Sequence, residues 1–208
     1  MSINPTAGMA ANLFHENMRD GDRRVAILAA ALDIFMRYGF NRTTMDDIAV
    51  AAGISRPALY RDFRNKADIY KALAAELLDR AAAAAEQVLS DNGPLRERLR
   101  RALDVGILDH LTAISQSPHG AEILEQKREL TDDVIAGWRQ RIAKALAKSL
   151  AAEAKTKEID LRARGFSPDS LADALLDGLD GAKSRSADPA RWRSAAARQI
   201  DLVMLALR

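Results

Sequence analysis

Two short predicted helices joined by a single glycine turn are the feature that most constrains this chain. Thr44 can cap a helix, and Asp47, three residues later, can reach back to complete a capping box. Gly53 ends that helix after barely two turns, and Ser55 can cap the next one at once. Pro57 lies in the first turn of the second helix, where a backbone N–H would have no helical partner. The spacing predicts a helix-turn-helix unit.

The second short helix should present two different faces. Leu59 and Phe63 are four residues apart and can hold it against Ile48 and Ala52 of the first helix. The opposite face is then left for solvent or for a ligand. At the start of this helix, the free amides, the positive end of the helix dipole and Arg56 can converge on an anion.

The remainder of the chain favours an all-α fold. Of the 208 residues, 48% are hydrophobic but only 5% are aromatic, and glycine (11) and proline (6) are sparse, which suits close-packed helices better than a sheet. Periodicity, caps and breaks predict about nine helices. Besides the two short ones, they start near Asp22, Asn65, Pro94, Ala121, Leu130 (running to Arg164), Pro168 and Pro189.

Composition argues against several classes of protein. There is no cysteine for a disulfide or a thiolate site, and no apolar run long enough for a membrane span or a secretory signal, so we expect a cytoplasmic chain. Its three histidines, His15, His110 and His119, accompany no hydrolase, phosphate-loop or metal-ligand motif. We therefore expect no enzyme activity, no cofactor and no metal. The net charge of +2 indicates a polyanionic partner only weakly.

The sequence around the two short helices resembles the DNA-binding domain of the TetR family of bacterial transcriptional regulators. The resemblance covers roughly Arg23 to Leu78. Its fixed points are Gly39-Phe40, Thr43-Thr44, Ile48-Ala49, Ala52-Gly53-Ile54-Ser55, Leu59-Tyr60, Phe63 and Asn65-Lys66. Residues 1–20 show no periodicity, which predicts a mobile arm. The resemblance implies a helix-turn-helix domain at 21–80 that includes the start of a connecting helix, and a helical effector-binding and dimerisation domain at 81–208.

The resemblance also implies which residues touch double-stranded DNA. Those expected to face base edges are Arg56, Pro57 and Ala58. Those expected to bind backbone phosphates are Thr43, Thr44, Ser55, Tyr60 and Lys66, with Arg42 and Arg61 as further nearby cations. Asp62 departs from the family pattern, because an acid so close to phosphates should repel them, and it is left out of the expected contacts.

Two such modules on an inverted repeat are needed for useful specificity, so a homodimer is expected. By resemblance, the last two helices form its interface, and the predicted apolar rows are Leu171, Leu175 and Leu179, and Trp192, Ala196, Ile200 and Val203. A small-molecule effector is expected among the middle helices. The candidate residues for that site are Leu103, Ile107, His110, Leu111 and Trp138.

The function implied is a regulator of transcription, by family habit a repressor whose operator affinity falls when the effector binds. One alternative is a helical dimer that binds DNA or serves as a scaffold without any effector and recruits a protein partner. The discriminating property is sequence preference. Each cap and apolar residue named above also has a purely structural explanation, because caps and core rows occur in any helical protein.

Overall fold

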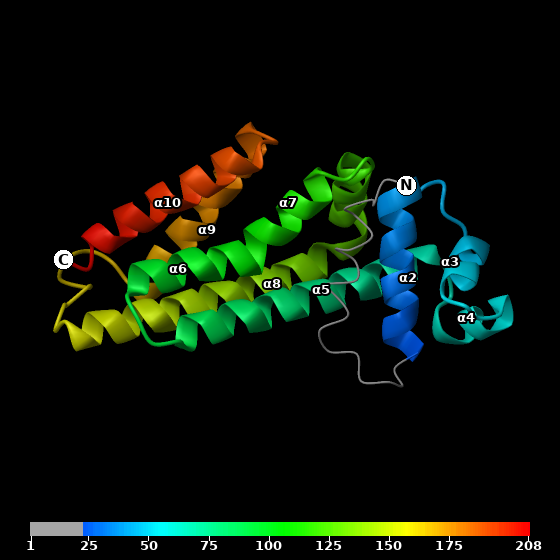
Figure 1. The fold of residues 1–208 in the computed structure, drawn as a ribbon. Coiled ribbons are helices and arrows are strands. Elements are labelled where there is room, and N and C mark those ends of the chain that lie inside the picture. The colour runs from blue at the N-terminus through cyan, green and yellow to red at the C-terminus, as the bar shows by residue number, and fades with distance from the viewer. Residues whose placement is uncertain (1–22) are drawn as a thin grey trace. The chain divides into compact units, whose positions relative to one another are not determined.

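The structure, a computed structural model, describes residues 23–208 without the side chains of residues 124–129 (Figure 1). The arm predicted at 1–20 lies outside the described residues. The helices are α2 (Arg23–Tyr38), α3 (Met45–Ala51), α4 (Arg56–Asp62), α5 (Lys66–Ser90), α6 (Leu95–Leu103), the π-helical turn η1 (Asp104–Leu108), α7 (Asp109–Ser115), α8 (Gly120–Thr156), α9 (Pro168–Arg185) and α10 (Pro189–Leu205).

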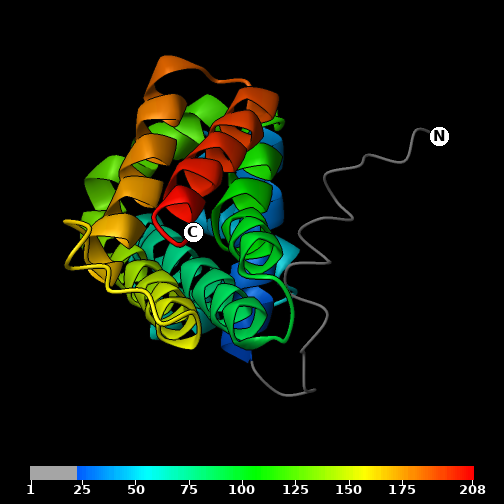
Figure 2. The ribbon, with the colours of Figure 1, turned by 90° about the vertical axis from the view of Figure 1, so that its left-hand side faces the viewer.

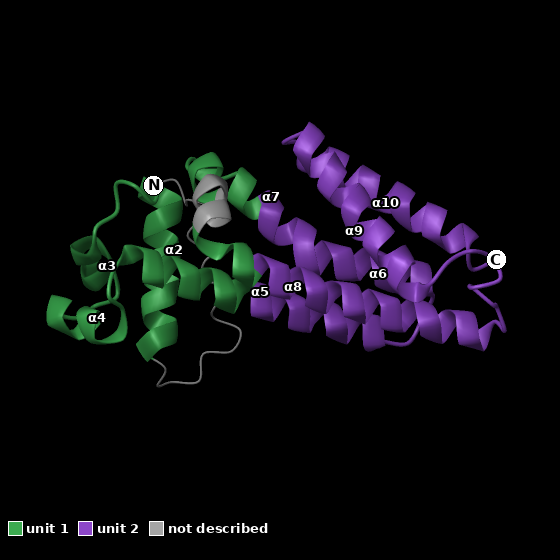
Figure 3. Ribbon diagram, turned by 180° about the vertical axis from the view of Figure 1, so that it is seen from behind, with its two compact units in different colours: residues 1–77, 113–134 green, residues 78–112, 135–208 purple. Residues whose placement is uncertain are grey.

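The all-α prediction is confirmed over this described part, which contains nine α-helices and no strand. None of these helices is both long and apolar enough to cross a bilayer. The chain divides into two compact units (Figure 3). Unit 1 comprises residues 1–77 and 113–134, and unit 2 comprises residues 78–112 and 135–208. Residues 113–134, which lie within the range 81–208 expected for the second domain, cluster with the helix-turn-helix in unit 1.

An aromatic cluster joins the pieces of unit 1. The rings of Phe35, Phe40 and Tyr70 lie 5.3 to 6.0 Å apart, centre to centre, in tilted and edge-on arrangements. Ile123, from the distant segment 113–134, is buried in the same core. The hydroxyl of Tyr70 donates to the carbonyl of Ile123 at 2.7 Å, and burial raises the pKa of Tyr70. The helix-turn-helix is thus held by a segment that the sequence pattern did not connect with it.

Gly39 fits this docking because it has no side chain. Its φ of +83° lies in the left-handed region, and a Cβ there would stand 2.4 Å from a carboxylate oxygen of Glu122. The same carboxylate accepts a hydrogen bond from the backbone nitrogen of Asn41 at 2.6 Å. The turn after α2 and the start of α8 therefore meet closely at Gly39, where any other residue would also have to adopt a left-handed backbone.

Unit 2 is a bundle whose last two helices, α9 and α10, lie side by side (Figures 1 and 2). The predicted starts of both are confirmed: Ser167 forms a capping box with Ser170, and Asp188 accepts from the nitrogen of Ala190 at 2.9 Å. The indole of Trp192 is buried, and its nitrogen donates to the carbonyl of Ser186 at 2.6 Å.

The helical run predicted from Pro94 is continuous to Ser115, but it contains the π turn η1. Gly106 lies in this turn, where an added Cβ would come within 3.0 Å of the Cβ of Ala85 on α5. The π turn inserts one residue into the helix and rotates everything after it. Sequence periodicity does not reveal such an insertion.

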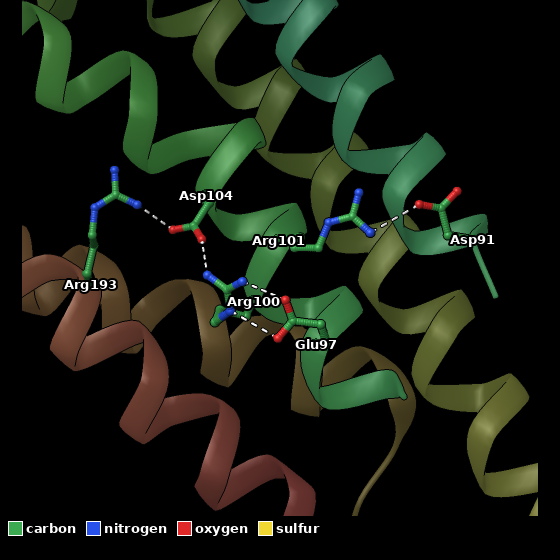
Figure 4. A network of polar contacts seen from close by, with 6 residues as sticks. All are labelled: Asp91, Glu97, Arg100, Arg101, Asp104 and Arg193. Atoms are coloured by element: carbon green, nitrogen blue, oxygen red, sulfur yellow. Dashed lines mark hydrogen bonds and ion pairs between the residues drawn. The ribbon is translucent and has the colours of Figure 1, made fainter. Parts of the chain in front are cut away.

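Charged side chains bind this turn to α10 (Figure 4). Asp104 accepts from Arg100 at 2.9 Å and from Arg193 of α10 at 2.5 Å. Arg193 also contacts Asp109, beyond the turn, at 2.7 Å. Arg100 is paired in addition with Glu97, and these hydrogen bonds hold the pKa of Glu97 below its ordinary value. The network therefore ties both ends of η1 to the last helix.

The end of α8 corrects a sequence prediction. A kink at Thr131 (φ −136°) lies close to the break expected before Leu130, but the helix ends at Thr156 instead of Arg164. Glu158 adopts a φ of +56°, and the nitrogen of Ile159 donates back to a carbonyl of the last turn. Glycine usually occupies the left-handed position of such a cap, so a glutamate there gave no stop signal.

Candidate nucleic-acid interface

The caps predicted for the two short helices are present. Thr44 accepts from the nitrogen of Asp47 at 3.2 Å, and the carboxylate of Asp47 accepts from the nitrogen of Thr44 at 2.9 Å. Hydrogen bonds from Thr44 lower the pKa of Asp47. Ser55 accepts weakly from the nitrogen of Ala58 at 3.4 Å, and Gly53 turns the chain with a φ of +65°. The sequence signals therefore place α3 and α4 as predicted.

The two faces of α4 are also as predicted. Leu59 is fully buried and Phe63 nearly so, and both belong to one hydrophobic core with Ile48 of α3. On the other side, Tyr60 is 42% exposed and Arg61 is exposed. The inner face fixes α4, and the outer face and its first turn are open to a partner.

The three residues expected at base edges do not share one environment. Arg56 and Pro57 are exposed at the start of α4. Ala58, by contrast, is buried, with only 9% of its surface accessible, and its carbonyl accepts a hydrogen bond from Arg23. Pro57 is therefore the exposed residue that can make the expected apolar contact with a thymine methyl, and Ala58 is not proposed as a DNA contact.

Two expected phosphate contacts are occupied inside the protein. Thr43 is 2% exposed, and its hydroxyl donates to the carbonyl of Gly39 at 2.7 Å. The ammonium of Lys66 donates to the carbonyls of Phe40 and Thr43 at 2.5 and 2.8 Å, with a longer bond to Asn41 at 3.3 Å. An ammonium has three donors, and all of them are used. In this structure, the side chains expected to bind phosphates at these two positions are thus engaged with backbone carbonyls of the same chain.

Lys66 instead closes the turn between α2 and α3, so its substitution should lower the stability of the protein in the absence of DNA. Lys66→Met is expected to lower the free energy of unfolding by about 1 to 2 kcal/mol, because partly buried carbonyls lose their donor. The measurement is urea unfolding of the free protein. Arg42→Met is the matched control: Arg42 is exposed, so its loss should leave unfolding unchanged. Equal stability of the two variants would contradict the structural role of Lys66.

The other expected phosphate contacts remain on the surface. Five of them are exposed: Arg42, Thr44, Ser55, Tyr60 and Arg61. The hydroxyl of Thr44 also donates to Asp47 at 2.7 Å, so it serves the cap first.

Asp62, which the family pattern left unexplained, is paired with a residue at the start of α2. Its carboxylate lies 3.0 Å from the guanidinium of Arg23, which also donates to the carbonyl of Ala58. The neighbouring Arg24 lies over the ring of Phe63 at 4.6 Å. The two arginines hold the start of α2 against α4, and the pairing offsets the negative charge of Asp62. Sequence reasoning missed Arg23 in this role, since no local signal links it to Asp62.

A second acidic residue, whose pairing sequence reasoning missed, lies next to Arg56. Asp46, at the start of α3, accepts a hydrogen bond from the Nη1 of Arg56 at 2.8 Å. The guanidinium also lies 5.5 Å from the ring centre of Tyr60. Asp46 also lies in the first turn of α3, where an acid interacts favourably with the positive end of the helix dipole.

The residues expected to bind an effector fall in unit 2. Leu103 and Ile107 are buried in its core, Leu111 and Trp138 pack against that core, and His110 is half-buried. The indole nitrogen of Trp138 is buried, and no hydrogen-bond acceptor for it exists among the described residues. The structure thus brings four of the five side chains to one core and leaves one buried donor unused there.

The residues expected at a dimer interface lie inside their own unit. The buried ones are Leu171, Leu175, Leu179, Trp192, Ala196, Ile200 and Val203, none more than 5% exposed. They pack in the core of one chain, so the predicted apolar rows form the inner faces of α9 and α10. On the outer face of α10, Leu202 and Leu205 are 59% and 53% exposed.

Comparison with known proteins agrees with this geometry. The model of the bacterial regulatory proteins of the tetR family matches residues 27–73. An HTH-type transcriptional repressor of Mycobacterium tuberculosis is 32% identical over 193 residues, covering 89% of this chain and 93% of that one. The probable HTH-type transcriptional regulator ArpR of Pseudomonas putida is 30% identical over 74% of this chain and 79% of its own.

A solved structure agrees in fold. SmeT, the repressor of the Stenotrophomonas maltophilia multidrug efflux pump SmeDEF, superposes with a TM-score of 0.60 over 88% of this chain and 89% of SmeT, at 20% identity. The helices α3 and α4 are capped, unit 2 is helical, and the Mycobacterium tuberculosis repressor matches 89% of the chain. The chain therefore belongs to the TetR family of bacterial transcriptional regulators.

Proposed function

We propose that this protein binds an inverted-repeat operator as a homodimer and represses transcription from it in the cytoplasm, where the chromosome lies. The observation that carries the proposal is the first turn of α4. Arg56 and Pro57 are exposed there, while Leu59 and Phe63 on the inner face anchor the helix. An anchored helix with an open N-terminal edge is the geometry that enters a major groove.

The chemistry of this edge suits base recognition with phosphate contacts around it. An arginine can pair with both acceptors of a guanine edge, and the pyrrolidine ring of Pro57 can meet a thymine methyl. Tyr60 and Arg61 are exposed on α4, and Arg42 is exposed in the turn before α3; all three side chains can bind phosphates. The phosphate contacts would fix register, and Arg56 would select sequence.

A dimer would use the outer faces of α9 and α10. Leu202 and Leu205, three residues apart on one face of α10, project into solvent, and a second chain that covered them would remove this apolar surface from water. One module reads only a few base pairs, so two copies are required for an operator to be recognised among competing sites.

A small-molecule effector would bind in unit 2. The unused indole N–H of Trp138 supports this, because a buried donor without an acceptor is destabilising and an acceptor on a ligand would satisfy it. SmeT, which shares the fold, has been solved with triclosan. The effector would act by favouring a conformation of the dimer with lower operator affinity.

The experiment that tests the function is selection from a random DNA library with the purified full chain. Enrichment of a short inverted repeat is the expected result, because two copies related by a two-fold axis each read one half-site. Enrichment of an isolated half-site would refute the dimer. Failure to enrich any sequence, with binding that depends on salt alone, would refute sequence-specific regulation and favour a nonspecific DNA-binding or scaffold protein.

A further inference from the structure

Arg56 is restrained on two sides before any DNA is bound. Its Nη1 donates to the carboxylate of Asp46 at 2.8 Å, and its guanidinium lies 5.5 Å from the ring centre of Tyr60. Asp46 belongs to α3 and Arg56 to α4, so the ion pair bridges the two helices of the motif. Both side chains are more than half exposed, and the pair therefore contributes little to stability.

The restraint leaves one edge of the guanidinium open. Arginine has five donors in a rigid, planar fork, and the ion pair takes one at Nη1. Within the described residues, no other acid pairs with Arg56. The edge made by Nε and Nη2 is then the one that can donate in parallel to the two acceptors of a guanine.

We propose that Asp46 is a positioning residue that sets the specificity of this protein by holding Arg56 with its Nε–Nη2 edge toward the base. This inference rests on the proposed function. A free arginine side chain samples many rotamers, and ordering it on DNA reduces affinity. Because Asp46 restrains Arg56 beforehand, less entropy is lost on binding the correct base pair, and the binding constant for that base pair is about 3- to 10-fold higher.

Asp46 has two other possible effects, and neither of them concerns sequence. As an acid in the first turn of α3, it interacts favourably with the helix dipole. As an anion near phosphates, it weakens binding to every duplex alike. Its removal would then strengthen binding to all DNA and leave discrimination as it was. The positioning role requires the reverse: discrimination falls even though an unfavourable charge is gone.

The test is a double-mutant cycle on discrimination. The probes are the duplex selected by the wild-type full chain, and the same duplex altered at the base pair where Arg56→Ala loses preference. The ratio of the two binding constants is measured for wild type, Asp46→Asn, Arg56→Ala and the double variant. Asp46→Asn is expected to lower the ratio about 3- to 10-fold in the wild-type background and to leave it unchanged in the Arg56→Ala background.

Matched controls separate the possible causes. Asp33→Asn removes the same charge from another exposed Asp–Arg pair of unit 1, that with Arg37, and should leave the ratio unchanged. Equal thermal unfolding of Asp46→Asn and wild type shows that α3 is intact. An unchanged ratio in Asp46→Asn, or an equal fall in the Arg56→Ala background, overturns the proposal. If the wild-type chain selects no DNA sequence at all, the proposed function itself is wrong. That outcome is distinct from the two outcomes that overturn only the role of Asp46.

Discussion

Alanine at position 59 is expected to lower the free energy of unfolding of unit 1 by about 2 to 5 kcal/mol. Leu59 has no accessible surface and belongs to the core that α2, α3, α4 and α5 share in unit 1. Its truncation removes buried methyl groups and leaves a cavity where α4 meets the rest of the unit. DNA binding should fall with it, because α4 loses the contact that anchors its inner face.

The measurement must report on unit 1. Both tryptophans lie in unit 2, so tryptophan fluorescence follows the wrong part of the chain. Hydrogen exchange of the α3 and α4 amides against urea gives the local free energy directly. The matched control is Val50→Ala, since Val50 is on α3 but 81% exposed, and it should change stability by less than about 0.5 kcal/mol. Similar losses in both variants would contradict the assigned core.

Arg56→Ala is expected to reduce discrimination at one base pair of each half-site by about 1 to 3 kcal/mol. That corresponds to about 5- to 150-fold in the ratio of binding constants. The reason is the loss of a bidentate donor to a base edge, with no change to the anchoring face. The ratio is measured by titrating labelled duplexes that carry each of the four base pairs at every operator position.

Arg61→Ala is the control for a charge that does not read bases. Arg61 lies in the last turn of α4 and is exposed. Its removal should weaken binding to all sequences to a similar degree and reduce the salt dependence by roughly one unit of slope. If Arg56→Ala also weakened all duplexes equally, Arg56 would be a phosphate contact, and sequence choice would have to come from elsewhere on α4.

The parts of this site that could be predicted are those specified by residues close together in the chain. Thr44 with Asp47, Gly53 and Ser55 act within a few positions of one another, so their spacing gives the start, the turn and the next start. The inner row of Leu59 and Phe63 follows from the helical period. Caps and periodicity likewise predicted the beginnings of α9 and α10 at Ser167 and Asp188.

The parts that could not be predicted depend on partners distant in sequence. Lys66 looks like a phosphate ligand until three carbonyls of the α2–α3 turn take its donors, and Asp62 looks repulsive until Arg23 meets it. Ala58 is a helix-start residue that the fold happens to cover. In each case the residue type is unchanged, and tertiary packing decides whether its side chain is exposed to solvent or already in contact with another part of the protein.

The same distinction applies to the larger arrangement. Helix propensity and the hydrophobic period determined that the chain is helical and that two short capped helices lie near its N-terminus. They could do so because the hydrogen bonds within a helix and at its caps join residues that are neighbours in the chain. Which segment completes unit 1 and which face of α10 remains exposed were decided by contacts between residues far apart in sequence. Which edge of Arg56 stays open was decided by a contact between two packed helices, α3 and α4. Those contacts form only when the core closes, so no local pattern encodes them.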